Sequence, residues 1–152
     1  MLQDVRKSFL LFFAVCVLLQ EPVTGIVTDA CSVANVFVNK LGVKRNVAAN
    51  WACLAKFASG FNTQALGQTD KNGNDYFGIF QINDKYCKRG TKTSCGVSCT
   101  ELVSDNILPS ATCALNIYQK EKDGFATWPA WKNNCKEINV NRFTDKCTIP
   151  PK

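Results

Sequence analysis

Two stretches in the first half of the chain carry apolar residues at the spacing of an amphipathic helix. The first covers residues 31–42 and stops at Gly42, and the second is opened by Asn46 as its predicted N-cap and stops at Gly60. The apolar positions that define the two faces are Val33, Val36, Phe37 and Leu41 in the first stretch and Trp51, Leu54, Ala55 and Ala58 in the second. We therefore predict two helices here.

After the second helix the pattern changes from helical spacing to that of a sheet. The dipeptide Asn72-Gly73 is a strong hairpin signal, and the aromatic and β-branched residues from Tyr76 to Ile82 predict a strand that follows it. These residues indicate a small antiparallel sheet between two helical parts of the chain.

The second half of the chain predicts one long helix and one short helix. Pro109 suits the first turn of the long helix, which ends at Asp123-Gly124, and a cysteine-rich, irregular stretch with one helical turn precedes it. Thr127 is the predicted N-cap of the short helix, with Pro129 in its first turn. Helices that flank one hairpin-based sheet make an α+β domain, here mainly helical.

The N-terminus has the features of a secretory signal peptide. Arg6-Lys7 precedes an apolar run from Ser8 to Leu19, which is too short to span a bilayer comfortably. We predict cleavage after Gly25, with a cut after Ala30 as the alternative and a retained signal anchor as the other reading. Residues 1–25 are thus expected to be a cleaved signal peptide and the protein to be secreted to the extracellular space.

Residues 26–152 correspond to one domain and contain eight of the nine cysteines. An even number of cysteines in a secreted domain favours four disulfides over a metal site, although the spacing leaves their pairing open. The chain has no histidine and no C-x-x-C pair, which disfavours zinc further. We expect neither a metal nor another cofactor.

The charge of the chain is moderately basic, with a formal net charge of +6. Such a surface favours anionic partners such as bacterial walls, acidic glycans or lipid headgroups, and it also serves solubility. Lysine and arginine are scattered rather than gathered in one stripe, so nucleic acid is not an expected partner. Residues 26–152 contain no apolar stretch long enough for a membrane span, and we expect a monomer.

Several motifs occur together in an order that is typical of one family. They are NWACLAKF at 50–57, FNTQA at 61–65, GIFQIND at 78–84 and W-x-A-W at 128–131, and the eight cysteines are interspersed with them. With these motifs, residues 26–152 resemble the C-type lysozyme and alpha-lactalbumin family. The resemblance implies a lysozyme-like fold and the disulfide pairs Cys31–Cys147, Cys53–Cys135, Cys87–Cys99 and Cys95–Cys113.

The resemblance also implies chemistry, the hydrolysis of β-1,4 bonds in bacterial wall glycan by two carboxylates. One carboxylic acid, held in an apolar pocket, protonates the leaving oxygen, while the second carboxylate is ionised. The acid is normally a glutamate in the last turn of the second helix, directly after the Lys-Phe pair, and here that position is Ala58. A methyl group cannot donate a proton, so the reactive site is expected to lack its acid.

The second carboxylate has two candidate positions in this chain. Counted from the second helix, Asp75 is the match, but the segment is one residue longer than in the family. Counted back from GIFQIN, Tyr76 takes the place instead. Because strand side chains alternate between faces, this single residue decides whether Asp75 points into the cleft, unless a bulge at Phe77 absorbs it.

The resemblance places five further residues along the cleft or its floor: Gln81, Asn83, Tyr86, Thr127 and Trp128. The segment DKYC offers only Tyr86 where the family commonly has two consecutive aromatic residues, which predicts reduced or redirected sugar binding. Some relatives bind calcium after the fifth cysteine. Here the matching positions are Ser104, Asn106, Pro109 and Ser110, which are too poor in carboxylates for calcium.

Three functions follow from these expectations. The first is a secreted, non-catalytic lysozyme-like protein that binds GlcNAc-containing glycan, peptidoglycan or an extracellular protein through the cleft. The alternative is a weakly active muramidase that hydrolyses β-1,4 bonds of peptidoglycan. The third is a cationic antibacterial protein that disrupts membranes without hydrolysis, although no basic amphipathic helix stands out.

Overall fold

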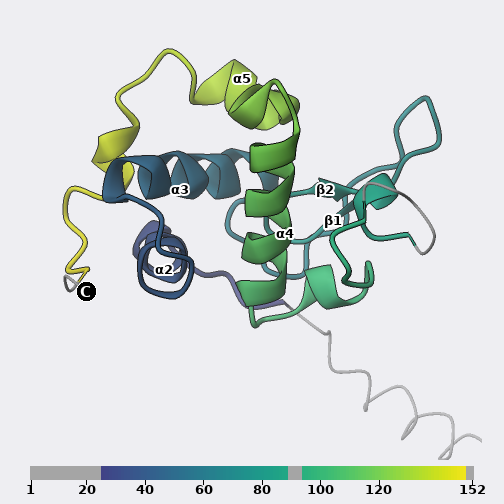
Figure 1. The fold of residues 1–152 in the computed structure, drawn as a ribbon, viewed down its shortest axis with the longest axis horizontal. Helices are drawn as coiled ribbons and strands as arrows, with labels where there is room; N and C mark the ends of the chain where they lie inside the picture. Colours follow the sequence, from purple (N-terminus) through teal and green to yellow (C-terminus); the bar gives the residue numbers. More distant parts are fainter. Residues whose placement is uncertain (1–24, 89–93, 150–152) are drawn as a thin grey trace, which may run out of the picture.

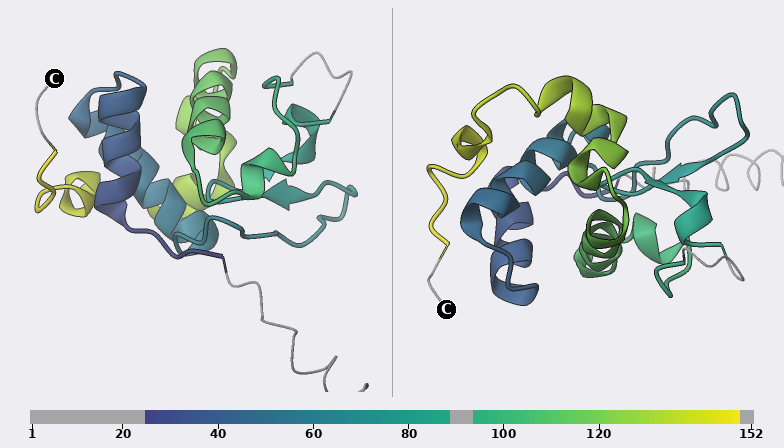
Figure 2. Two further views of the ribbon diagram at one scale, coloured as in Figure 1. Left: turned by 90° about the horizontal axis from the view of Figure 1, so that it is seen from below. Right: turned by 45° about the horizontal axis from the view of Figure 1, so that its top comes forward.

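The structure is a computed structural model, and it describes residues 25–88 and 94–149 (Figure 1). Apart from Gly25, the predicted signal peptide lies outside these residues. The elements in chain order are α2 (Ala30–Asn35), the π-helical η1 (Val36–Lys40), α3 (Arg45–Ser59), β1 (Tyr76–Phe77), β2 (Ile82–Asn83), and the 3₁₀ turns η2 (Asp84–Tyr86) and η3 (Glu101–Val103), followed by α4 (Leu108–Lys120), η4 (Gly124–Thr127), α5 (Pro129–Asn134) and η5 (Val140–Phe143). Helix α4 lies between the α2–α3 pair and the small sheet (Figure 2).

The core is centred on Trp51 of α3, which is fully buried. Its ring stacks on Phe37 with centroids 4.7 Å apart, and it meets Phe80 and Trp128 edge-on at 5.9 and 5.5 Å. These contacts join α3 to η1, to the turn between the strands and to the start of α5. The helical spacing predicted from the sequence therefore places its apolar residues in one aromatic core.

Helix α3 starts one residue before the predicted cap. Lys44 occupies the N-cap position without a side-chain hydrogen bond, and Asn46 lies inside the first turn. The prediction for Asn46 is wrong because a residue with helical backbone cannot adopt the extended geometry of a cap. The C-terminal end is as expected, since Gly60 takes the left-handed conformation at φ +62°.

The segment predicted as one strand is divided into two. β1 and β2 pair antiparallel in the register Tyr76↔Asn83 and Phe77↔Ile82, so the chain reverses between them. Gly78 makes this reversal possible, because its φ is +73° and an added Cβ would lie 1.9 Å from the carbonyl oxygen of Leu102. The Asn72-Gly73 turn is also present, with the Gly73 amide donating to the Asp70 carbonyl at 3.0 Å.

The helices of the second half begin where proline allows it. Pro109 lies in the first turn of α4, which ends at Lys120, before the predicted stop at Asp123-Gly124. The N-cap of α5 is Trp128, without a side-chain hydrogen bond, so the prediction of Thr127 as the cap is wrong. Thr127 instead ends the preceding turn η4, and its hydroxyl makes no hydrogen bond within the described residues.

Four disulfides fix the fold, and they join the pairs that the resemblance implied. Cys31–Cys147 and Cys53–Cys135 tie the C-terminal segment to the helices α2 and α3. Cys87–Cys99 and Cys95–Cys113 tie the segment after the sheet to itself and to α4. The predicted fold class is confirmed: a mainly helical α+β domain with a small antiparallel sheet and four disulfides.

Candidate functional site

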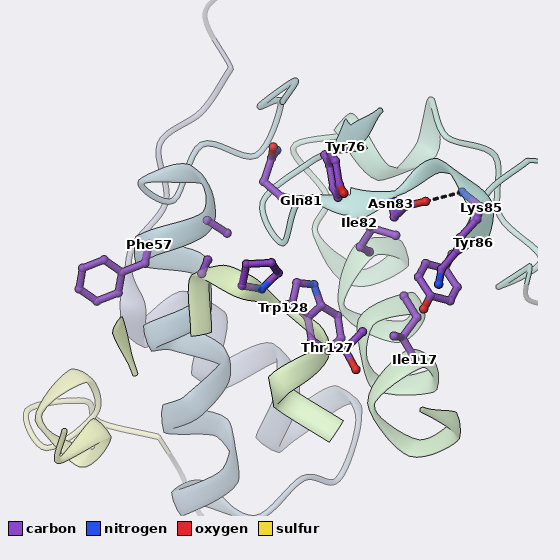
Figure 3. Close-up of a pocket in the computed structure, with 13 residues that line it drawn as sticks. Phe57, Tyr76, Gln81, Ile82, Asn83, Lys85, Tyr86, Ile117, Thr127 and Trp128 are labelled. Atoms are coloured by element: carbon purple, nitrogen blue, oxygen red, sulfur yellow. Dashed lines mark hydrogen bonds between the residues drawn. The ribbon is translucent and has the colours of Figure 1, made fainter. Parts of the chain in front are cut away.

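A cleft of about 420 Å³ lies between the small sheet and the segment from η4 to α5 (Figure 3). Its walls come from the end of α3, both strands, η2, α4 and the start of α5. The lining residues are Phe57, Ala58, Tyr76, Gln81, Ile82, Asn83, Lys85, Tyr86, Ile117, Thr127, Trp128, Pro129 and Ala130. The cleft thus gathers Ala58 and the five predicted binding residues from distant parts of the chain.

Ala58 lies in the last turn of α3 and lines the cleft. The next residue, Ser59, donates its hydroxyl to the carbonyl oxygen of Ile79 at 2.8 Å and so fixes the helix end against the chain between the strands. None of the described residues that line the cleft is an aspartate or a glutamate, and Lys85 is the charged one among them. A proton donor with a carboxyl group is therefore missing from the described walls.

Tyr76, and not Asp75, is the residue of this segment that lines the cleft. Asp75 accepts a hydrogen bond from the hydroxyl of Thr69 at 2.6 Å, and its carbonyl oxygen accepts from the amide of Asp84 at 2.9 Å. The two strands pair residue for residue at Tyr76 and Phe77, so the extra residue is not absorbed by a bulge at Phe77. Tyr76, the residue selected by the count back from GIFQIN, is thus the one that lines the cleft.

The ring of Tyr76 is held in the wall by its hydroxyl, which donates to Asp70 at 3.0 Å. Asp70 also accepts from the amides of Asn72 and Asn74, at 2.8 and 3.0 Å, and from the side-chain amide of Asn74. These bonds, with that of the Asn74 side chain first, hold the pKa of Asp70 down at about 2. Burial is the main cause that raises the pKa of Tyr76. The Asn72-Gly73 turn therefore anchors a tyrosine in the cleft.

Gln81 and Asn83 contribute amide side chains to the cleft wall, and both also hold the sheet in shape. The Gln81 side chain donates to the carbonyl oxygens of Gly78 at 2.9 Å and Ala65 at 3.2 Å, which supports its own positive φ of 49°. The side-chain oxygen of Asn83 accepts from the amide of Lys85 at 2.9 Å and caps η2.

Tyr86 closes one end of the cleft and is only 5% exposed. Its hydroxyl donates to Glu121 at 2.6 Å, and the ammonium group of Lys85 lies 4.6 Å from its ring centroid. Burial, followed by the bond to Glu121, raises the pKa of Tyr86 strongly. The sequence did not reveal this contact, because Glu121 follows α4 at a separation of 35 residues and no local pattern joins the two.

Thr127 and Trp128 lie on the opposite side of the cleft, before α5. Trp128 is 6% exposed, so most of its ring belongs to the core around Trp51. The hydroxyl of Thr127 is buried and has no hydrogen-bond partner within the part of the chain that the structure describes. Trp131 does not line the cleft, and its ring nitrogen donates to Asn50 at 2.9 Å.

The described residues hold no group of three or more histidine, cysteine, aspartate or glutamate side chains that could bind a metal. At the positions matched to calcium-binding relatives, Ser104 and Asn106 accept bonds from backbone amides, and Ser110 donates to the carbonyl oxygen of Leu102. Within residues 25–88 and 94–149, no helix is sufficiently long and apolar to cross a membrane.

Comparisons with known proteins agree with this architecture. The model of the C-type lysozyme/alpha-lactalbumin family matches residues 26–147. A lysozyme of Hyalophora cecropia is 42% identical over 102 residues, covering 65% of this chain and 72% of the relative. Lysozyme C of Allenopithecus nigroviridis is 35% identical over 141 residues, covering 88% of this chain and 94% of the relative. The crystal structure of a lysozyme from Litopenaeus vannamei is similar with a TM-score of 0.68 and 28% identity, covering 82% of this chain and 98% of that one.

Proposed function

The chain belongs to the C-type lysozyme/alpha-lactalbumin family, and we propose that it is a secreted, non-catalytic member that binds GlcNAc-containing glycan through its cleft. Secretion is supported by the predicted signal peptide and by the four disulfides, which persist in oxidising compartments. Peptidoglycan fragments and GlcNAc oligomers are the proposed ligands, because the relatives named above are lysozymes.

One observation carries the proposal that the protein is not an enzyme. Ala58 and Tyr76 both line the cleft. The resemblance assigns the general acid to the position of Ala58 and, counted back from GIFQIN, the second carboxylate to that of Tyr76. Loss of a general acid alone typically lowers a rate by about 10²–10⁴-fold. Loss of the ionised carboxylate as well leaves a developing sugar cation without its stabilising charge.

The remaining cleft is suited to binding a neutral sugar. The half-buried ring of Tyr76 offers an apolar surface, and pyranose rings contact such surfaces at low entropic cost. The Gln81 and Asn83 amides add polar groups at the walls. A concave site of this volume, mostly apolar with a few polar groups, is the usual form of a small-ligand site.

A weakly active muramidase is the second candidate, and the names of the relatives favour it. It requires a carboxyl group that reaches the oxygen of the bond to be cleaved. Among the described residues, two carboxylates are hydrogen-bonded to cleft residues: Glu121 accepts from the Tyr86 hydroxyl at 2.6 Å, and Asp70 accepts from the Tyr76 hydroxyl at 3.0 Å. Neither carboxylate is among the residues that line the cleft, so the non-catalytic function is preferred.

The test compares lysis of a peptidoglycan suspension, from acidic to neutral pH, by secreted wild-type protein, Ala58→Glu and Ala58→Glu/Tyr76→Asp. We expect no lysis by wild type, little by the single variant and lysis by the double variant, because two carboxylates are required. The matched control is Ala58→Gln/Tyr76→Asn, which has the same shape without the acid groups. Lysis by wild type or by this control would show that the acid lies elsewhere.

Binding is measured separately, by calorimetric titration of wild type with chitotriose. Saturable binding that a mutation at Tyr76 weakens supports the proposed ligand class. Failure to bind chitotriose and soluble peptidoglycan fragments would overturn the proposal that the cleft binds glycan. The proposal that the protein does not hydrolyse peptidoglycan is tested separately, by the lysis assay.

A further inference from the structure

Asp105 connects three segments of the chain that meet at one corner of the fold. Its Oδ1 accepts from the Thr63 hydroxyl at 2.7 Å, from the Gln64 side-chain amide at 3.1 Å and from the backbone nitrogen of Ile26 at 3.2 Å. Ile26 is 79 residues away from it in sequence. Neither the cleft nor the proposed function uses this cluster.

The segment that starts at Ile26 is fixed on both sides of this contact. The carbonyl oxygen of Ile26 accepts from the amide and the hydroxyl of Thr63, at 3.1 and 2.9 Å. Val27 forms an antiparallel bridge with Asn62, and the amide of Thr28 donates to the carbonyl oxygen of Phe61 at 3.0 Å. The backbone nitrogen of Ile26 therefore has a defined place beside the Asp105 carboxylate.

Ile26 is also the residue that follows the predicted cleavage point. We propose that cleavage after Gly25 turns the Ile26 amide into an ammonium group that pairs with Asp105, so that removal of the signal peptide completes this junction. Water adds across the peptide bond: Gly25 leaves as a carboxylate, and the Ile26 nitrogen becomes an amine that is protonated at neutral pH. The proposal rests on the predicted cleavage point and not on glycan binding.

The chemistry of the junction favours a cation there. A hydrogen bond between two charged groups is roughly twice as strong as one between neutral groups. The Thr63 hydroxyl first, and then the Ile26 nitrogen, already lower the pKa of Asp105. The acceptor therefore stays ionised at the pH at which the new amine is protonated, and the pair is attractive over the physiological range.

The same geometry favours the cut after Gly25 over the alternative after Ala30. Cleavage after Ala30 would remove Asp29, whose carboxylate caps α2 by accepting from the amide of Ser32 at 2.9 Å. It would also remove the bridge between Val27 and Asn62. A Cβ at Gly25 would lie 2.7 Å from the Asn62 side-chain oxygen, so the small residue expected before a cleavage site also fits the fold.

The experiment expresses the full precursor in secreting eukaryotic cells and collects the mature protein from the medium, with intact mass reporting its first residue. Four chains are compared by thermal unfolding: wild type, Asp105→Asn, a chain with one glycine inserted between Gly25 and Ile26, and the combination of both changes. The inserted glycine moves the ammonium group away but keeps the Ile26 amide. Asp145→Asn, at an exposed position, is the matched control for loss of one negative charge.

We expect Asp105→Asn to lower Tm by about 2–4 °C when the chain starts at Ile26, and by clearly less when the glycine precedes it. The reactivity of the terminal amine gives a second readout that does not depend on stability. An amine-acylating reagent should modify Ile26 several-fold more slowly in wild type than in Asp105→Asn, because the pair keeps the amine protonated. Equal Tm losses in both backgrounds, equal acylation rates, or a mature chain that starts elsewhere than Ile26 would each overturn the proposal.

Discussion

The core around Trp51 and the wall of the cleft both take residues from helix α3, yet these residues follow different constraints. Trp51 and Ala55 are fully buried, and the Trp51 ring contacts Phe37 and Phe80, whereas Ala58, one turn after Ala55, lines the cleft. The core residues decide whether the chain folds, and few of them can change without a large loss of stability. Ala58 and Tyr76 in the wall are only partly buried and should contribute less to folding, although other lining residues, such as Ile82 and Trp128, belong to the core as well. The fold therefore places a weak constraint on which residues occupy positions 58 and 76, as the proposed non-catalytic function requires.

The sharpest test of the core is Trp51→Ala. We expect a loss of about 3–5 kcal/mol in the free energy of unfolding, because a large buried aromatic ring is deleted from a packed cluster. Urea unfolding followed by far-UV circular dichroism measures this loss. Phe57→Ala is the control on the same helix, since the Phe57 side chain is 42% exposed, and it should cost less than half as much. Similar losses for both variants would contradict the distinction between core and wall.

Gly78 lies where the core and the cleft wall meet, and Gly78→Ala should be the next most damaging change. We expect a loss of about 2–3 kcal/mol, because the new Cβ would lie 1.9 Å from the Leu102 carbonyl oxygen at a φ of +73°. Gly73→Ala is the matched control, with φ +80° but nothing within 4 Å of its Cβ. It should cost about 1 kcal/mol. If the two variants unfold at the same urea concentration, the close approach to Leu102 is not the cause.

These two glycines also show how far the sequence could predict the fold. Gly73 belongs to a two-residue signal that is local, and the turn is where it was predicted. Gly78 interrupts an otherwise strand-like run, and a glycine there is a local signal of a break. The close approach that excludes a side chain at Gly78 comes from Leu102, which is 24 residues further along and which no local pattern indicates. The caps predicted at Asn46 and Thr127 are wrong for a related reason, since neighbouring elements set where each helix begins.

The candidate site was predictable to the extent that it follows from family motifs. Those motifs placed Ala58 in the wall, together with Gln81, Asn83, Tyr86, Thr127 and Trp128, and the structure brings all six to one cleft. Which of Asp75 and Tyr76 lines the cleft could not be predicted, because the one-residue insertion leaves the facing of the strand residues ambiguous. The bond from Tyr86 to Glu121 joins distant segments, and no pattern of spacing predicts it.

Among the residues of the cleft wall, we expect the largest effect on ligand binding from Tyr76→Ala. We expect binding of chitotriose to weaken about fivefold to tenfold, because an aromatic contact surface is lost. The free energy of unfolding should change by less than about 1.5 kcal/mol, since the ring is only half-buried. Calorimetric titration and urea unfolding measure the two effects. Tyr86→Phe is the control: its ring is 5% exposed and its hydroxyl faces Glu121, so binding should change little. If Tyr86→Phe weakens chitotriose binding more than Tyr76→Ala does, the sugar contacts the Tyr86 end of the cleft instead.

The smallest expected effect is a pH dependence that arises from Asp70, the anchor of Tyr76. Its pKa falls from the usual 3.8 to about 2 in the folded protein, chiefly through the Asn74 side chain. A lowered pKa means that this carboxylate stabilises the fold above pH 3.8 and that the stabilisation is lost as pH falls towards 2. Asp70→Asn should therefore lower Tm slightly at pH 5, and the difference from wild type should shrink between pH 4 and pH 2. Because the other carboxylates titrate in both proteins, the difference isolates Asp70. A Tm difference that is constant over this range would mean that the hydrogen bonds from Asn72, Asn74 and Tyr76 do not depend on the charge of Asp70. The position of Tyr76 in the wall would then depend on packing and not on this carboxylate.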